Sequence, residues 1–371
     1  MNTIMHIVQA TGGVERYLYT LLSNSDKTEY RNILVCSQEY DYENFKNLAE
    51  QVEFVEMYRK INLLNDLKAI TQVRNIIKKY KPDIVYMHSS KAGAIGRIAN
   101  LGITNISVYN AHGWAFNMRC SNKKKIIYTT IEKMLAPLCT KIIAISDFEK
   151  RSAVERGVCK PEKIEVILNG INIKEYENVT PVRRIDLGIP EDAFIVGTVG
   201  RLTEQKAPDI FVKAAKKIKE KIPNSYFVMV GDGDQQEVIE KLIKNQELQD
   251  CFVITGWVKN PIDYISCFDI ATLLSRWEGF GLVLAEYMIT GKPIVATRAD
   301  AIPDIITDGE NGLMANVDDI DGVYRAVVKI HDDKALAGRL VQNKLSCAKD
   351  RFNFERVVKE TEQLFRQALK V

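Results

Sequence analysis

Short apolar runs alternate with longer amphipathic segments along most of this chain. In the first half, the apolar runs predict strands at 3–9, 31–36, 83–88, 105–111, 142–145 and 164–168. In the second half, they predict strands at 194–199, 226–230, 252–255, 268–274 and 293–297. Helical periodicity lies between these runs, for example over residues 62–80. Regular alternation of strands and helices is typical of parallel sheets, so we expect an α/β protein with two doubly wound, Rossmann-like domains.

The boundary between the two domains is expected near residue 170. Asn169-Gly170 follows a strand, and a polar, proline-bearing stretch then continues to Ile189-Pro190, which predicts a linker. We therefore expect an N-terminal domain over residues 1–170 and a C-terminal domain over residues 171–353. The last helix, about 354–371, has an apolar stripe, which predicts that it packs back on the first domain.

The composition is that of an ordinary globular protein. The chain has 371 residues, 46% of them hydrophobic, with 51 basic and 48 acidic side chains. No run of 18 apolar residues occurs, and the first strand leads into a glycine turn instead of a cleavage site. Neither a membrane span nor a signal peptide is therefore expected. We expect a cytoplasmic protein.

The sequence predicts neither a metal nor a cofactor. The seven cysteines are scattered without a CxxC pair, so they are expected to be reduced. The four histidines have no metal-ligand spacing. Asp232-Gly233-Asp234 has the DxD spelling of metal-dependent glycosyltransferases, but it closes a predicted strand and has no ligand cluster around it.

Basic residues are concentrated in one part of the first half. From Arg59 to Lys141 there are 15 Lys and Arg against three acidic residues. Within this part, Trp114 and Phe116 precede three consecutive lysines, 123–125, and an apolar helix. This mixture is typical of a membrane interface or of a site for a phosphate-bearing lipid, although a solvated basic loop before a core helix explains it equally well. Nothing accompanying the charge indicates nucleic acid. The first of these two interpretations predicts a peripheral contact of the N-terminal domain with an anionic membrane, at the inner face of the plasma membrane.

The most informative stretch is residues 275–297. It predicts a loop carrying Glu278, a glycine-bracketed turn, a helix over about 282–290 and a buried strand. Unpaired amides and the dipole at the start of this helix would form a phosphate site. On one continuous helix Glu278 and Glu286 would lie roughly 12 Å apart, beyond the ~5–9 Å of a glycosidase pair. We expect them to hold different parts of one long ligand.

Two cations are predicted where a diphosphate would bind. Arg201 follows the strand at 194–199, and Lys206 precedes a helix that begins near Pro208. A forked guanidinium and a compact ammonium at these positions would hold a diphosphate and offset the charge that develops on it as a leaving group.

The first half also carries candidate ligand contacts at predicted strand ends. Gly12 and Gly13 follow the first strand, where they would let a ligand approach the backbone closely. They lack the GxGxxG spacing, which argues against NAD. His112 follows the strand at 105–111, and it could orient or polarise a ligand hydroxyl. Ligands of doubly wound sheets bind at the carboxyl ends of the strands.

Taken together, these motifs resemble the retaining glycosyltransferases of family 4. The resemblance covers nearly the whole chain, and its most specific part is Glu278, seven residues and Glu286, with Gly279-Phe280-Gly281 inside and Gly291-Lys292-Pro293 after it. The other matching motifs are Gly12-Gly13, His112-Gly113, Ser146-Asp147, Asn169-Gly170-Ile171, Gly200-Arg201 with Lys206, and Gly231-Asp232-Gly233.

The resemblance implies the GT-B fold of two facing Rossmann-like domains and a metal-independent transfer that retains the anomeric configuration. It implies that the second domain binds a nucleotide-sugar and the first an acceptor. Arg201 and Lys206 would hold the diphosphate, Glu278 and His112 the sugar, and Glu286 the ribose. The remaining donor-binding positions that it implies are Gly12, Gly13, Gly231, Val258, Phe280, Gly281 and Leu282.

The sequence does not determine the donor sugar, and it is compatible with two alternative functions. Ala207 stands where the family usually has glycine, and Asn172 where Asp is common, so the donor sugar is not determined. Our leading hypothesis is transfer from a UDP-sugar, such as an N-acetylhexosamine donor, to a lipid-linked or glycan acceptor in surface-polysaccharide assembly. The alternatives are a nucleotide-sugar 2-epimerase of the same fold and a non-catalytic, membrane-associated partner of a transferase.

Overall fold

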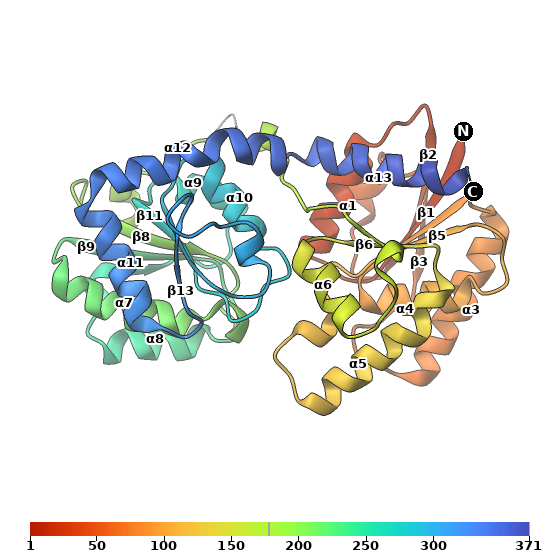
Figure 1. Ribbon diagram of the computed structural model, residues 1–371, viewed down its shortest axis with the longest axis horizontal. Helices are drawn as coiled ribbons and strands as arrows, with labels where there is room; N and C mark the ends of the chain where they lie inside the picture. The colour runs from red at the N-terminus through yellow and green to blue at the C-terminus, as the bar shows by residue number, and fades with distance from the viewer. Residues whose placement is uncertain (177–178, 371) are drawn as a thin grey trace. The chain divides into compact units, whose positions relative to one another are not determined.

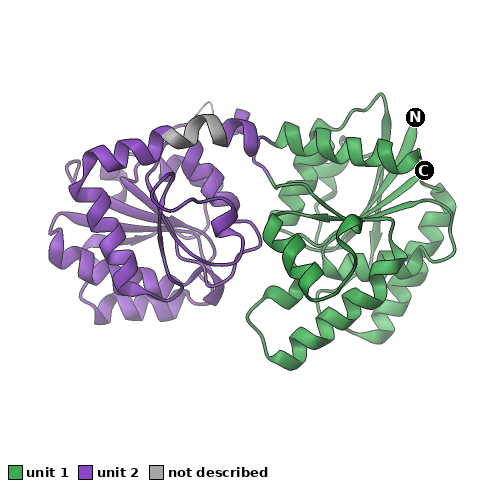
Figure 2. Cartoon of the chain, viewed as in Figure 1, with its two compact units in different colours: residues 1–169, 354–371 green, residues 170–353 purple. Residues whose placement is uncertain are grey.

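The computed structural model describes residues 1–176 and 179–370, and it describes no side chain in 343–347. The chain divides into two compact units (Figure 2): unit 1 is Met1–Asn169 with Phe354–Val371, and unit 2 is Gly170–Asn353. Each unit contains one sheet in which every paired strand is parallel to its neighbours. The predicted fold class, two doubly wound Rossmann-like domains, is confirmed.

Unit 1, on the right in Figure 1, has a seven-stranded sheet. The order of its strands is β3-β2-β1-β4-β5-β6-β7. Its strands are β1 (Asn2–Val8), β2 (Tyr30–Ser37), β3 (Gln51–Val55), β4 (Ile84–His88), β5 (Ile106–Asn110), β6 (Lys141–Ala144) and β7 (Ile164–Val166). Its helices are α1 (Gly13–Asn24), α2 (Tyr42–Phe45), α3 (Leu63–Tyr80), α4 (Ser90–Ala99), α5 (Asn122–Leu135), α6 (Asp147–Glu155) and α13 (Phe354–Leu369). Helix α13 packs against α1, and its Phe354, Val357 and Phe365 enter the core on that face of the sheet.

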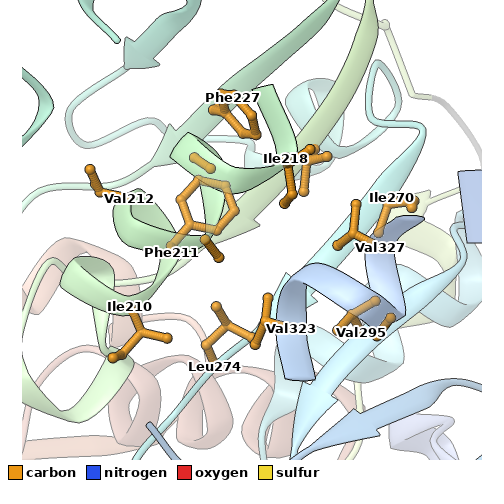
Figure 3. Close-up of a cluster of buried hydrophobic side chains, with 14 of the residues drawn as sticks. Ile210, Phe211, Val212, Ile218, Phe227, Ile270, Leu274, Val295, Val323 and Val327 are labelled. Carbon is orange, nitrogen blue, oxygen red and sulfur yellow. The ribbon is translucent and has the colours of Figure 1, made fainter. Parts of the chain in front are cut away.

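Unit 2 has a six-stranded sheet in the order β10-β9-β8-β11-β12-β13. Its strands are β8 (Phe194–Val199), β9 (Ser225–Val230), β10 (Phe252–Ile254), β11 (Ile270–Leu273), β12 (Ile294–Thr297) and β13 (Leu313–Ala315). Its helices are α7 (Pro208–Lys221), α8 (Gln236–Asn245), α9 (Pro261–Ile265), α10 (Leu282–Ile289), α11 (Ile320–Asp332) and α12 (Lys334–Arg351). Figure 3 shows its core, where Phe211 and Ile218 of α7 and Val323 and Val327 of α11 pack over the sheet.

The strand orders define where a ligand would bind in each unit. In unit 1 the order reverses between β1 and β4, and in unit 2 it reverses between β8 and β11. At such a point the loops after two neighbouring strands turn to opposite faces and leave a crevice at their carboxyl ends. Arg201 and Lys206 follow β8, and Glu278 follows β11. Gly12 and Gly13 follow β1.

Two expectations about the chain's organisation need correction. Residues 180–190 of the polar stretch predicted as a linker pack on unit 2, where the Arg184 guanidinium donates to the carbonyls of Ala193 and Cys267 and pairs with Asp269 at 3.2 Å. Residues 177–178 of that stretch lie outside the described residues. The edge strands β3 and β13 lie outside the predicted set, and β3 has only one buried residue. Six cysteines are free thiols, and the side chain of Cys347 lies outside the described residues. Within the described ranges, no helix is long and apolar enough to span a membrane.

Candidate active site

The centre of the site in unit 2 is an ion pair between the loops after β8 and β11. Lys206 Nζ lies 2.5 Å from Glu278 Oε2, and the same oxygen accepts a hydrogen bond from Ser275 Oγ at 3.0 Å. The Glu278 residue is 8% exposed. Its second oxygen, Oε1, has no hydrogen-bond partner within the described part of the chain. The structure therefore brings these two predicted residues together and leaves one carboxylate oxygen to accept a bond from a ligand.

The loop that carries Arg201 is held by two glycines after β9. A Cβ on Gly231 would lie 2.3 Å from the Gly200 carbonyl oxygen, and a Cβ on Gly233 would lie 2.4 Å from that of Leu202. Only glycine permits the loop after β9 to approach the loop after β8 this closely. A hydrogen bond from the Leu202 amide to the Asp232 carbonyl at 2.7 Å joins the two loops. Arg201 is exposed, and its guanidinium has no partner within residues 1–176 and 179–370. Gly231 thus supports the loop through its backbone, while Arg201 is available to an anion.

Arg276 is a supporting residue that the sequence analysis missed. Its Nη2 contacts both carboxylate oxygens of Asp209 at 2.9 Å, and its Nε contacts Asp318 at 2.7 Å. Its Nη1 donates to the carbonyl of Glu204, within the 3₁₀ turn Glu204–Lys206 that presents the lysine. Arg276 therefore ties the Lys206 segment to the loop of Glu278. A lone arginine two residues before a glutamate carries no sequence signal for this role.

Helix α10 begins with the free amides that the phosphate prediction requires. Gly281, the residue before the helix, has φ 85°, a left-handed conformation that favours glycine. The amides of Phe280, Gly281 and Leu282 donate no hydrogen bond to any described residue outside the helix itself. The Phe280 side chain is buried against Phe352, with ring centroids 5.8 Å apart. The backbone of this turn, and not the Phe280 ring, is therefore what a ligand can contact.

The two remaining predicted donor contacts of unit 2 are Glu286 and Val258. Glu286 is 7% exposed within α10, and its Oε1 accepts a hydrogen bond from the Tyr176 hydroxyl at 3.0 Å. Val258 is half-buried in the loop after β10, beside Trp257, which is 73% exposed. Glu278 precedes α10 and Glu286 lies within it, so the spacing calculated for one continuous helix does not apply.

In unit 1, the glycine turn lies open at the end of β1. Gly12 has φ 74° and precedes α1, and its amide is 3.4 Å from Glu15 Oε2. A Cβ on either Gly12 or Gly13 would meet nothing within 4 Å. The positive φ explains the glycine at position 12. Gly13 meets no packing contact, so its backbone is open to a close approach.

The ends of β4 and β5 are strained next to His112. His112 has φ 53°, and its amide donates to Asn110 Oδ1 at 2.9 Å. Ser89, between β4 and α4, has φ 72° and ψ 159°, a region that is nearly restricted to glycine and costs about 1–3 kcal/mol. The Ser89 hydroxyl is buried without a hydrogen-bond partner in the described residues. Strain of this kind is concentrated at functional sites.

His112 belongs to a row of three histidines that the sequence analysis also missed. His6 Nδ1 lies 3.2 Å from His88 Nε2, and His88 Nδ1 lies 3.1 Å from His112 Nε2. Burial lowers the pKa of His6 to about 4 and that of His112 to about 3, and it lowers the pKa of His88 well below its usual value. All three imidazoles are therefore neutral at pH 7. The strand register could have indicated this row, because His6 and His88 lie on one face of neighbouring strands.

The aromatic part of the predicted membrane contact is wrong. Trp114 is 2% exposed and Phe116 is fully buried; the two rings stack at 5.3 Å, and Trp114 Nε1 donates to the Glu149 carbonyl. Their side chains fill the core beneath α5 and are not available to a lipid. Other apolar residues are exposed instead, namely Met118, Ile126, Ile127 and Met134 on or beside α5.

In the described part of the chain, no group of three or more His, Cys, Asp or Glu residues could hold a metal ion. Asp232 takes part in the loop contact through its backbone carbonyl. The loop after β9 therefore has a packing explanation for its Gly-Asp-Gly sequence.

The chain is similar to known glycosyltransferases in sequence and in fold. The family described as glycosyltransferase family 4 matches residues 11–175, and that described as glycosyl transferases group 1 matches residues 180–346. An Escherichia coli relative, UDP-Gal:alpha-D-GlcNAc-diphosphoundecaprenol alpha-1,3-galactosyltransferase, is 30% identical over 82% of this chain and 80% of its own length. The Staphylococcus aureus capsular polysaccharide biosynthesis glycosyltransferase CapM is 25% identical over 91% of this chain and 90% of its own. The solved structure of Anabaena Alr3699/HepE in complex with UDP-glucose superimposes over 99% of this chain and 100% of its own, with a TM-score of 0.81 at 20% identity.

Proposed function

This chain belongs to glycosyltransferase family 4 and is a glycosyltransferase of surface-polysaccharide biosynthesis, and we propose that it transfers a sugar from a UDP-sugar to a lipid-linked acceptor with retention of the anomeric configuration. The observation that carries the proposal is the Lys206–Glu278 pair, because it sets a cation and a carboxylate with a free oxygen side by side at the switch point of unit 2. A nucleotide-sugar has both chemical groups that such a pair recognises, a diphosphate and sugar hydroxyls.

The donor would be held by groups that already lie at the carboxyl edge of the unit 2 sheet. Lys206 has three N–H groups, and the bond to Glu278 uses one of them. The others, the exposed Arg201 guanidinium and the amides of residues 280–282 would hold the diphosphate. Glu278 Oε1 would accept a bond from the sugar, and Glu286 would bind the ribose in place of the Tyr176 hydroxyl. The pairing of Lys206 with a carboxylate keeps its stem fixed over Gly200.

In the retaining mechanism that we propose, the acceptor hydroxyl attacks from the face that the diphosphate leaves. The chain's contribution is electrostatic: Arg201, Lys206 and the α10 amides stabilise the negative charge that grows on the departing phosphate oxygen. That oxygen can then take the proton of the acceptor hydroxyl. No metal or cofactor enters this proposal.

The acceptor is proposed to be a sugar carried on a lipid diphosphate, as the name of the Escherichia coli relative states for that protein. Exposed apolar side chains support a membrane contact through unit 1: Ile126 is 66% exposed, Ile127 53% and Met134 71%, beside the exposed lysines 123 and 124. Basic residues attract anionic lipid headgroups, while exposed apolar side chains enter the interface.

The transfer is tested with the purified chain, a panel of UDP-sugars and a short-chain polyprenyl-diphosphate N-acetylglucosamine acceptor. We expect release of UDP that depends on the acceptor, and an α-linked product from an α-configured donor, as read by NMR. A β-linked product would contradict retention. An epimerised sugar formed with the donor alone would contradict transfer and identify the epimerase.

The membrane contact is tested by pelleting with vesicles of phosphatidylglycerol and phosphatidylcholine. We expect Ile126→Asp with Ile127→Asp to weaken pelleting at least tenfold. Val238→Asp is the matched control, because Val238 is similarly exposed, at 63%, but lies on α8 of unit 2. Equal pelleting of both variants and the unaltered chain would refute a contact through α5.

A further inference from the structure

Unit 1 contains a continuous row of hydrogen-bonded side chains that ends at His112. Starting within the sheet, Asn32 Oδ1 lies 3.2 Å from His6 Nε2. The row continues from His6 Nδ1 to His88 Nε2 at 3.2 Å, and from His88 Nδ1 to His112 Nε2 at 3.1 Å. The rings of His6 and His88 are stacked with 17° between their planes, and those of His88 and His112 with 21°. The row therefore connects the interior of the sheet to the carboxyl ends of the strands.

The parallel register produces this row. Asn32 lies on the same face of β2 as His6 does on β1, because Ile4 pairs with Asn32. His6 pairs with Tyr86 and Val8 pairs with His88, so side chains at alternate positions of β1 and β4 share this face. His112 follows β5, and its φ is positive, so the backbone turns there at the end of the strand. Its ring meets that of Tyr17 edge to face, with centroids 4.6 Å apart.

One amide determines the direction of every bond in the row. The Asn32 oxygen can only accept, and its nitrogen donates to Ser25 Oγ at 3.2 Å, so His6 Nε2 must carry a hydrogen. A neutral imidazole has one N–H and one bare nitrogen. His6 Nδ1 is then the acceptor for His88 Nε2–H, and His88 Nδ1 is the acceptor for His112 Nε2–H. The last bare nitrogen is His112 Nδ1, which has no hydrogen-bond partner among the residues that the structure describes.

We propose that Asn32, His6 and His88 are positioning residues that fix His112 in the Nε2–H tautomer, so that its Nδ1 accepts a hydrogen bond from a ligand hydroxyl. A hydroxyl can donate this bond, whereas a keto oxygen or a carboxylate at the same place cannot. The row would therefore select for a free hydroxyl on the ligand group that faces His112. The identity of that group as part of the donor sugar rests on the proposed function, whereas the direction of the row does not.

The surroundings of the row favour its neutral form. Two tyrosines contact it: the Tyr86 ring lies 4.1 Å from that of His88, and Tyr17 contacts both His88 and His112. Burial raises the pKa of both phenols, so neither carries a charge at neutral pH. The two phenol oxygens are 3.2 Å apart. No acidic side chain makes a hydrogen bond or ion pair to the three imidazoles within the described ranges.

The direction of the row is measured by NMR of the intact chain labelled with ¹⁵N in histidine only. The chain has four histidines, so a long-range ¹H–¹⁵N correlation spectrum resolves each tautomer. At pH 7.5 we expect protonated Nε2 and bare Nδ1 for His6, His88 and His112. Protonated Nδ1 in these residues would show that Asn32 has the opposite orientation, and it would overturn the proposal. A charged imidazolium in the row would overturn it as well.

The role of the row is tested with Asn32→Leu, which removes the acceptor at its origin. We expect His112 to show a mixture of tautomers and the KM for the nucleotide-sugar to rise roughly tenfold, the effect of losing one hydrogen bond. Asn100→Leu is the matched control, because Asn100 is buried in unit 1 and its side-chain amide, among the described residues, pairs only with that of Asn105. It should leave the spectrum and the KM unchanged.

Two outcomes separate this proposal from the proposed function. If the wild-type spectrum shows the expected tautomers but no UDP-sugar is used, the transferase proposal fails and the row remains. If Asn32→Leu changes the tautomer of His112 while the KM stays constant, the row does not act on the ligand, and the positioning role is refuted. Should Asn32→Leu fail to fold, the wild-type spectrum still decides the direction.

Discussion

Acid should destabilise unit 1 through the buried histidines. His6 is 1% exposed, and burial lowers its pKa from 6.5 to about 4. Between these values the unfolded chain binds a proton at this residue that the folded chain does not. Stability therefore rises with pH across this range. The contribution of His6 is complete above pH 6.5 and is lost as the pH falls toward 4.

The magnitude follows from the pKa. One pH unit corresponds to about 1.4 kcal/mol, so excluding the proton from His6 removes about 3 kcal/mol of unfolding free energy at pH 4. His88 and His112, whose pKa values are also lowered by burial, act in the same direction. At this end of the row, Glu362 lines a cavity of about 10 Å³ together with His6 and Asn32. This loss is large for a domain whose total stability is about 5–15 kcal/mol.

The assay is urea unfolding of unit 1 at pH 7.5, 6.5, 5.5 and 4.5. Trp114 is buried in unit 1, so its fluorescence reports on that unit alone once Trp257 and Trp277 are replaced by Phe. In this background, His6→Gln should reduce the change in the free energy of unfolding between pH 7.5 and 4.5 by about 2 kcal/mol. His331→Gln, in unit 2, should not change it. Parallel pH profiles for His6→Gln and its parent would refute the reasoning.

Three further predictions concern unit 2. Lys206→Ala should raise the donor KM and lower kcat, reducing kcat/KM at least 100-fold. Lys217→Ala breaks an exposed 2.5 Å pair between α7 and α11 and should leave steady-state kinetics unchanged, so equal kinetics for the two variants would argue against the site. Glu278→Gln keeps the side-chain volume but removes its charge, so kcat should fall about 100-fold with little change in thermal unfolding, and an unchanged kcat would exclude a role for this carboxylate. Gly233→Ala places a Cβ 2.4 Å from the Leu202 carbonyl oxygen, so calorimetry should show a loss of about 1–3 kcal/mol; a stability equal to that of the unaltered chain would mean that the loop moves without cost.

Local sequence predicted where some site residues lie, but not which of them contact each other. The glycines and cations stand directly after apolar strands, and the ends of parallel strands share one edge of a sheet. Local order was therefore enough to place Arg201 and Lys206 after β8 and Glu278 after β11. The same reasoning could not pair Lys206 with Glu278, because 72 residues separate them and their distance depends on the order of strands.

The local sequence pattern also could not predict which side chains are buried. Trp114 and Phe116 stand beside a basic segment, which favoured an exposed interface, yet both rings fill the core under α5. Arg276 likewise has no distinguishing neighbours in sequence, and its role emerges only where Asp209 and Asp318 converge on it. Each of these outcomes depends on which elements cover a residue in space.

The sequence by itself determined the class of fold, the positions of most strands and the edges at which a ligand would bind, because hydrophobic periodicity and glycine turns act within a few residues. The tertiary structure alone decided which side chains meet. The row of His6, His88 and His112 shows the reason: its members lie 82 and 24 residues apart, and only the register between β1 and β4 and the turn after β5 bring their rings into hydrogen-bonding distance.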